Sequence, residues 1–226
     1  MGLSHSPSIV TDGLVLCLDA ANPRSYPGSG TSWLDLSGRG NNGTLKNSPT
    51  FSYDNGGIIN FDGTNDRIDF PVTYISGGTS MSLETWIKPA SSQAQYAVIF
   101  DTYHGGSGGW VIQQNSNNLN SFYFAWWTGS WQISSGISLS TSKFNHFLVV
   151  QNGTSVTGYV DGNSVMTYTG NNTNSYMSGR TLHIGGWGSG GRHFNGSIVC
   201  PKIYNRALTA DEVRRNYLAT KSRFGL

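Results

Sequence analysis

The chain has 226 residues, a length at which a β-sandwich can form a single domain. Only 12% of the residues are charged, against about 25% in an average globular domain, whereas glycine (30 residues) and the aromatic residues (12%) are frequent. The formal net charge of +2 is too small to indicate binding to nucleic acid or insertion into an anionic membrane surface. This composition excludes a disordered chain and favours short strands joined by tight turns.

The N-terminal residues predict neither a secretory signal nor a membrane span. They lack a basic segment followed by an apolar stretch, and the apolar run Leu14–Leu18 has only the length of a strand. No apolar run approaches the ~20 residues that a transmembrane helix needs. We therefore expect synthesis in the cytoplasm without a signal peptide, with the protein either kept there or released by lysis. The alternative is that the sequence is a mature fragment. We expect a single domain over residues 1–226, with residues 1–11 as an N-terminal arm.

Short strand-forming runs recur along the whole chain, and most are bounded by Gly, Asn, Asp or Ser. Their spacing, without long helices between them, favours an antiparallel sandwich over a parallel α/β sheet. The predicted strands are Leu14–Leu18, Ile58–Phe61, Ile68–Phe70, Met81–Ile87, Ala97–Phe100, Trp110–Gln113, Phe122–Trp127, Phe147–Val150, Val156–Val160, Val165–Tyr168, Leu182–Ile184 and Ile198–Tyr204.

Two local signals are more specific. Asp161-Gly162 lies between two strand-forming runs, and this pair is typical of a type I′ hairpin turn, because both residues tolerate a positive φ. Thr209 followed by Glu212 three residues later is a capping box, which predicts one short helix over Thr209–Leu218. The glycine-rich stretches Gly105–Gly109 and Gly185–Gly191 are expected to be loops within the domain.

Six segments, in this order, resemble the concanavalin A-like lectin/glucanase superfamily, in its laminin-G-like branch. This resemblance implies a two-sheet antiparallel jelly roll in which the first and last strands lie close together. Its fold hosts many functions, so it indicates the fold more strongly than the ligand. The segments are residues 12–45, NFDGTNDRIDF (60–70), SLETWIKP (82–89), residues 144–162, LHIGG (182–186) and FNGSIVCPKIYNRALTADEV (194–213).

The adjacent terminal strands would bring Cys17 and Cys200 near one another. We nevertheless expect no disulfide, because the cytoplasm is reducing, and two cysteines make neither a disulfide framework nor a zinc pattern. The opening segment and the closing segment YNRALTADEVRRNYLATKSRFGL also resemble tailed-bacteriophage proteins, which are regarded as virion-surface proteins. That resemblance implies a location on the virion surface.

Catalysis is not expected. A glycoside hydrolase needs two carboxylates across the scissile bond, and the glucanases of this superfamily carry alternating acidic residues on one strand. Glu84 is alone on its predicted strand, and Glu212 belongs to the capping box. Asp66 and Asp69 have an unsuitable spacing, which favours a role in turn formation.

The segment FYFAWWTGSW provides candidate binding residues. Strict alternation places Phe122, Phe124 and Trp126 on one face and Tyr123, Ala125 and Trp127 on the other, and one of the faces must be core. Aromatic rings on the second face could stack on sugars or on a protein partner. Trp86 is assigned to the core. The alternative interpretation is that long loops cover both faces. The candidate ligand-binding residues are Tyr123, Trp127, Trp131 and Trp187.

Asp35, Asp62 and Asp66 are candidate calcium ligands. Their loops supply the hard oxygen donors that calcium prefers, and relatives in this superfamily often hold calcium at a loop rim. The alternative is that these aspartates form Asx turns with nearby backbone N–H groups. A metal role for His146 is not expected.

The leading hypothesis is a non-catalytic virion-surface protein of a tailed phage, either a capsid decoration or a tail-associated module. Its partners would be other virion proteins and weakly adsorbed cell-surface glycans. The alternative is a free carbohydrate-binding lectin domain, since an exposed aromatic face suits either function.

Overall fold

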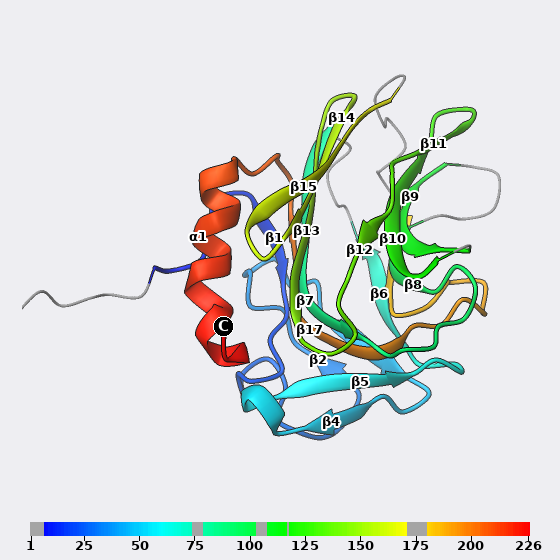
Figure 1. The fold of residues 1–226 in the computed structure, drawn as a ribbon. Coiled ribbons are helices and arrows are strands. Elements are labelled where there is room, and N and C mark those ends of the chain that lie inside the picture. The colour runs from blue at the N-terminus through cyan, green and yellow to red at the C-terminus, as the bar shows by residue number, and fades with distance from the viewer. Residues whose placement is uncertain (1–6, 74–78, 103–107, 117, 171–179) are drawn as a thin grey trace, which may run out of the picture.

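The computed structural model describes residues 7–73, 79–102, 108–116, 118–170 and 180–226. Within these residues the chain forms two antiparallel sheets packed face to face, and one α-helix lies against the outside of the first sheet (Figure 1). The predicted two-sheet sandwich with one short C-terminal helix is therefore confirmed. No helix in the described part of the chain is both long enough and apolar enough to cross a membrane.

The first sheet has eight strands in the order β15-β14-β13-β7-β17-β5-β4, and β1 pairs with β17 beside this path. The long strand β17 joins the two halves, because it pairs with β7 on one side and with both β5 and β1 on the other. The strands are β1 (Leu14–Cys17), β4 (Thr50–Ser52), β5 (Ile58–Asp62), β7 (Ser80–Pro89), β13 (Asn145–Asn152), β14 (Ser155–Val160), β15 (Asn163–Thr169) and β17 (Asn195–Tyr204).

The second sheet has nine strands in the order β11-β10-β9-β8-β16-β6-β3-β2, and β12 pairs with β10. Five of the short strands of the two sheets, β2, β3, β4, β11 and β12, were not predicted, because runs of two to four residues are too short to show alternation. The strands are β2 (Ser32–Trp33), β3 (Gly43–Lys46), β6 (Arg67–Thr73), β8 (Val98–Asp101), β9 (Trp110–Asn115), β10 (Asn118–Trp127), β11 (Trp131–Ile133), β12 (Ile137–Ser138) and β16 (Arg180–Ile184).

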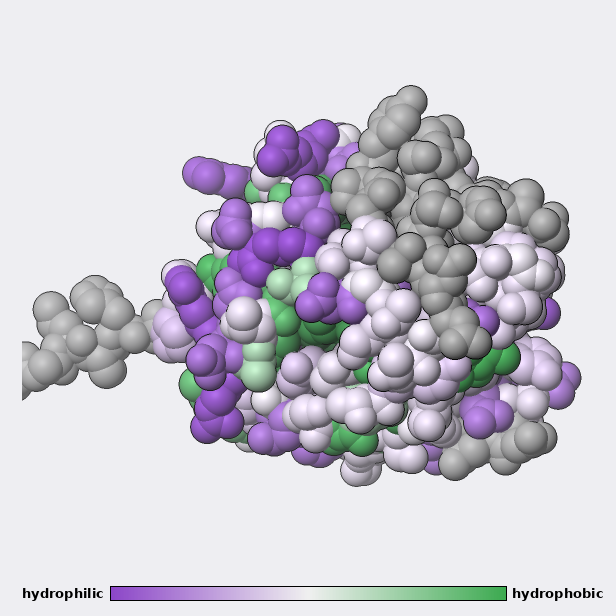
Figure 2. Space-filling model, turned by 90° about the horizontal axis from the view of Figure 1, so that it is seen from above, coloured by the Kyte–Doolittle hydropathy of each residue, from purple (hydrophilic) through white to green (hydrophobic). Residues whose placement is uncertain are grey.

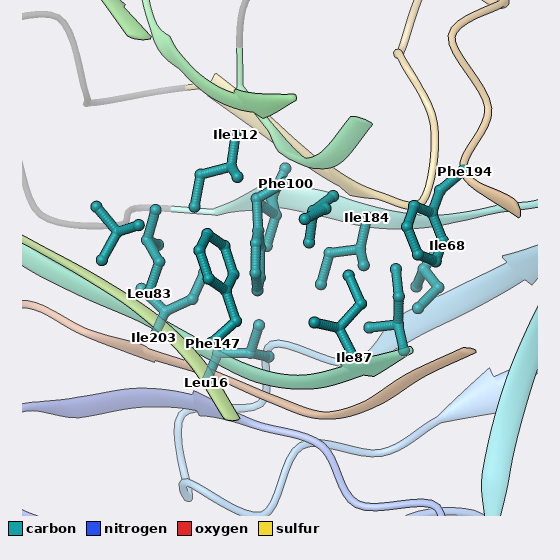
Figure 3. Close-up of a cluster of buried hydrophobic side chains, with 14 of the residues drawn as sticks. Leu16, Ile68, Leu83, Ile87, Phe100, Ile112, Phe147, Ile184, Phe194 and Ile203 are labelled. Atoms are coloured by element: carbon teal, nitrogen blue, oxygen red, sulfur yellow. The ribbon is translucent and has the colours of Figure 1, made fainter. Parts of the chain in front are cut away.

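The main hydrophobic core fills the space between the sheets (Figure 3). Alternation along β10 sends Phe122, Phe124 and Trp126 into this core, as predicted, and all three are fully buried. The same period along β7 sends Leu83 and Ile87 inward from the other side. One face of β7 and one face of β10 therefore pack in the core, and their other faces point outward from the sandwich.

The two local signals are confirmed. Val160 pairs with Asn163, so Asp161 and Gly162 form a two-residue hairpin turn with φ values of 51° and 77°. Helix α1 (Ala210–Thr220) begins after the N-cap Thr209, which makes the complete capping box with Glu212. A 3₁₀ turn, η2 (Lys221–Phe224), extends the helix, and a second one, η1, covers Asp54–Gly56.

The first and last strands pair, also as predicted. β1 runs antiparallel to the end of β17, with Cys17 opposite Lys202. Cys200 lies at an irregularity in β17 with a φ of 52°. Both cysteines are buried free thiols, and burial raises the pKa of Cys17 to about 11, which disfavours the reactive thiolate.

Helix α1 and turn η2 cover the outer face of the first sheet. Trp86 is fully buried there, with its ring stacked 4.2 Å from that of Phe224 and its indole N–H donating to Thr220 Oγ1 at 2.9 Å. Trp86 is therefore a core residue, as assigned, and it belongs to a separate buried cluster under the helix and not to the cluster between the sheets. The N-terminal arm joins this layer, because Val10 is buried and Arg215 donates to Ser8 O. Hydrophilic residues gather on the α1 side of the molecule (Figure 2).

Candidate functional site

The outer face of the second sheet carries a hollow of about 390 Å³. Its floor is formed by aliphatic side chains that cross-strand pairing brings into one row: Val111 of β9 lies opposite Ala125 of β10, and Ala125 lies opposite Ile133 of β11. Larger side chains stand around this floor, which leaves a depression over the β9–β11 end of the sheet. Val111 and Ala125 belong to a cluster separate from the main core, so the hollow lies on the side that faces away from the first sheet.

Four aromatic side chains line the hollow: Tyr96, Tyr123, Trp131 and Trp187. Trp131 is 37% exposed, Trp187 is half-buried, and Tyr123 is buried at the side of the floor. Three of the four predicted binding residues therefore come together here. The fourth, Trp127, lies outside the lining and packs edge-on against Trp131, with ring centroids 5.5 Å apart. Trp127, Trp131 and Trp187 all keep solvent-accessible surface.

Polar side chains at one wall are held in fixed positions. The Arg192 guanidinium lies over the rings of Trp187 (4.4 Å) and Tyr96 (5.1 Å), which is a cation–π arrangement. Its Nη1 donates to Gln113 Oε1 at 3.3 Å, and the amide of Gln113 in turn contacts the Tyr123 hydroxyl. Burial raises the pKa of Tyr123, so its phenol stays neutral and keeps its hydrogen-bonding proton at physiological pH.

Asp101 places a fully buried carboxylate at the edge of the floor, where its Oδ2 accepts from Gly188 N at 3.4 Å. Next to it, across the sheet, His183 of β16 bonds to Asp69 of β6 at 2.9 Å. Burial acts to raise the pKa of Asp69, but hydrogen bonds from Arg67 and His183 outweigh it and lower the pKa below its ordinary value. The bond from Gly188 N to Asp101 helps to hold the loop that carries Trp187.

Sequence reasoning missed Tyr96, Asp101 and Gln113 as lining residues, and it reached Arg192 only as the end of the glycine-rich stretch 185–192. None belongs to a motif, and only the folded sheet brings them beside the predicted aromatic residues. One signal was available: Arg192 directly follows the glycine-rich stretch Gly185–Gly191, which was singled out as a loop.

The three candidate calcium ligands lie in hydrogen-bonded loops. Asp35 accepts from the backbone N–H groups of Cys17, Ser37 and Asn41, and Asp62 accepts from Thr64 and Asn65. Among the described residues, no group of three or more His, Cys, Asp or Glu side chains could hold a metal ion. These contacts agree with the Asx-turn alternative.

One carboxylate oxygen is an exception. Asp66 Oδ1 is buried and has no hydrogen-bond partner, and burial raises the pKa of this carboxyl group. An oxygen of this kind fits a cation, with Asp62 as the neighbouring donor. Calcium binding stays a prediction: a chelator should lower the melting temperature, because an ion that binds only the native state stabilises it.

Comparison with known proteins identifies the family. A family model described as the Concanavalin A-like lectin/glucanases superfamily, of the laminin-G type, matches residues 62–214, which is more than half of the chain. The chain belongs to this family. No curated protein matches its sequence.

Several solved structures share the fold of this family member. Domain 4 of AbnA, a GH43 extracellular arabinanase from Geobacillus stearothermophilus, solved in complex with arabinotriose, superposes with a TM-score of 0.72 at 17% identity. The alignment covers 91% of this chain and 98% of that domain.

Botulinum neurotoxin chains are similar as well. The type C toxin, whose cell entry is described as dependent on two ganglioside molecules, gives a TM-score of 0.68 at 17% identity. The receptor-binding domain of the type G toxin gives 0.67 at 15% identity. This chain is covered to 92% and 91%, but it spans only 52% and 51% of those chains, about half of their length. At such identities the likeness shows the fold alone.

Proposed function

We propose that this protein is a non-catalytic carbohydrate-binding domain and that the hollow on the outer face of the second sheet holds the sugar. The observation that carries the proposal is the convergence of Tyr123, Trp131 and Trp187 on one hollow that also offers fixed hydrogen-bonding groups. A volume of about 390 Å³ lies within the range of small-ligand sites, roughly 300–1,000 Å³.

The lining matches the two kinds of surface that a sugar ring presents. Aromatic rings provide flat apolar surfaces for the C–H face of a pyranose or furanose ring. Arg192 provides a guanidinium group and Gln113 an amide for hydroxyl groups at the ring edge. Arg192 is held by two rings and by Gln113, so binding requires little ordering of this side chain.

The similar structures support the same class of ligand. The arabinanase domain was solved with arabinotriose, and the type C neurotoxin is described with gangliosides. We propose binding without hydrolysis, because Asp101 is the one carboxylate in the described lining of the hollow, whereas glycoside hydrolysis needs a pair.

A glycan array followed by titration calorimetry tests the proposal, with arabinotriose included as a defined probe. We expect Trp131→Ala and Trp187→Ala each to weaken binding by ~1 kcal/mol or more without unfolding the domain. Tyr53→Ala is the matched control, because Tyr53 is an aromatic residue that is 81% exposed and lies outside the hollow lining. The proposal fails if no glycan binds, or if binding is unchanged in both tryptophan variants.

The virion-surface assignment rests on the resemblance of the two terminal segments, and the comparisons do not bear on it. It stays a prediction. A phage particle that carries symmetric copies of this chain would support it, and the hollow would then serve for adsorption to cell-surface glycans.

A further inference from the structure

The outer face of the first sheet holds a buried polar cluster that plays no part in the hollow. Its centre is the Glu84 carboxylate on β7, which is fully buried. Lys202 of β17 donates from Nζ to Glu84 Oε1 at 2.8 Å, and Asn216 of α1 donates from Nδ2 to Glu84 Oε2 at 2.6 Å. His146 Nε2 lies 3.2 Å from Oε1. Glu84, alone on its strand by sequence, therefore has partners on two other strands and on the helix.

The three central groups form a reactive combination. A lysine amine is a nucleophile, an asparagine carboxamide is an acyl donor, and one carboxylate holds both side by side. The Asn216 carbonyl oxygen accepts from Val10 N at 2.8 Å, so a backbone N–H is already aimed at the atom that becomes negative during attack. Lys202 is 3% exposed and Asn216 is fully buried, so water is largely excluded from the cluster.

We propose that Lys202 and Asn216 join in an intramolecular isopeptide bond, with Glu84 as the acid–base catalyst. The proton of the Lys202 ammonium passes to Glu84 along their hydrogen bond, which frees the amine lone pair. The amine attacks Cγ of Asn216, and the carbonyl electrons move to Oδ1, where the Val10 N–H stabilises them. Glu84 donates its proton to Nδ2 and takes up the second proton of the attacking nitrogen. The C–N bond of the carboxamide breaks, ammonia leaves, and Glu84 returns to its starting form once ammonia has taken that proton.

The electrostatics of the cluster hold Glu84 and Lys202 as an ion pair, and it is the burial of the pair that favours the neutral forms needed for the first step. Burial acts to raise the pKa of Glu84 and to lower that of Lys202, but their attraction outweighs burial and keeps them as an ion pair. Buried apolar side chains lie beside the pair: Leu148 is opposite Glu84 in the pairing of β13 with β7, and it belongs with Val213 of α1 to one buried cluster. An apolar environment penalises the two charges, so it reduces the cost of converting the pair into a neutral acid and a neutral amine.

The surroundings also provide a route for the product. Lys202 lines a second cavity of about 260 Å³, together with residues of β1, of the end of α1 and of η2. Ammonia can leave through this space while the helix stays in place. The bond would then tie β17 to α1 and hold the helix permanently on the first sheet.

The mass of the intact, denatured wild-type chain tests the proposal. We expect it to fall below the sequence mass by one molecule of ammonia. After trypsin digestion, residues 193–206 should be recovered joined to residues 216–221, with no cleavage after Lys202. This measurement needs no variant to fold. A wild-type chain at full sequence mass, with these peptides recovered separately, overturns the proposal.

Variants identify the source of the lost mass, because Asn-Gly pairs such as Asn152-Gly153 also lose ammonia when they cyclise on the backbone. Lys202→Met, Asn216→Ala and Glu84→Gln should each restore the full mass. Lys46→Met is the matched control, since Lys46 is exposed and lies outside the cluster, and it should keep the deficit. A deficit that persists in Lys202→Met would place the lost ammonia elsewhere and overturn the assignment.

Discussion

The outer faces of the two sheets are both formed by the outward side chains of alternating strands, but one face is covered and the other is open. On the first sheet, α1 and η2 cover the outward side chains, so Trp86, Glu84 and Lys202 are buried as completely as core residues. On the second sheet, the outward side chains of β9, β10 and β11 surround a hollow that stays open to solvent. An outward-facing tryptophan is therefore part of the structure on one face and available for binding on the other.

The largest expected difference between the faces concerns tryptophan removal. Trp86→Ala should lower the free energy of unfolding by ~3–5 kcal/mol, because it leaves a cavity under the helix and breaks the bond to Thr220. Trp131→Ala should change it by no more than ~0.5 kcal/mol, because that ring is already 37% exposed. Urea denaturation of both variants measures the two values. Equal losses would show that the second face is covered in solution as well.

Filling the hollow should remove binding while the fold survives. Ala125→Leu places a larger side chain on the floor, in space that a bound sugar would occupy, so we expect at least a tenfold loss of affinity, or ~1.4 kcal/mol. The melting temperature should change little, because the added atoms enter the hollow and not a packed core. Ser82→Leu is the matching change on the other face. Ser82 is fully buried on the helix-covered side, so there we expect overpacking and a loss of ~1–3 kcal/mol of stability.

The sequence predicted which residues share a face but not what covers each face. Alternation along β10 correctly separated Phe124 from Tyr123, because the strand period is a local property. The same reasoning assigned Trp86 to the core but could not say which cluster it joins, because nothing near it in the sequence shows that the helix covers the outer side of its strand.

Partners that lie far away along the chain explain the other omissions. Glu84 bonds to His146, Lys202 and Asn216, which are 62, 118 and 132 residues away, so the strand alone shows a single acid. Arg192 and Gln113 are likewise 79 residues apart. Side chains that meet only through sheet topology carry no signal in a single sequence, whereas the capping box of Thr209 and Glu212 does.

The smallest expected effect is a dependence of the helix cover on acid. Hydrogen bonds from Arg206 and from the backbone of Thr209 outweigh burial and lower the pKa of Glu212 from 4.5 to about 2. Because the pKa is lower in the folded state, the stabilisation is complete above pH 4.5 and is lost as the pH falls towards about 2. Because the ion pair of Glu212 with Arg206 is partly exposed, we expect the free energy of unfolding to fall by only ~0.5–1 kcal/mol.

Unfolding free energies of wild type and Glu212→Gln, compared between pH 6 and about 2.5, measure the effect. The variant should lose less stability than wild type over this interval, since it has no carboxylate to protonate at the start of α1. Parallel curves would mean that the Glu212 carboxylate does not help to hold the helix on the first sheet, and that the cover depends on other contacts, such as those of Trp86 and Asn216.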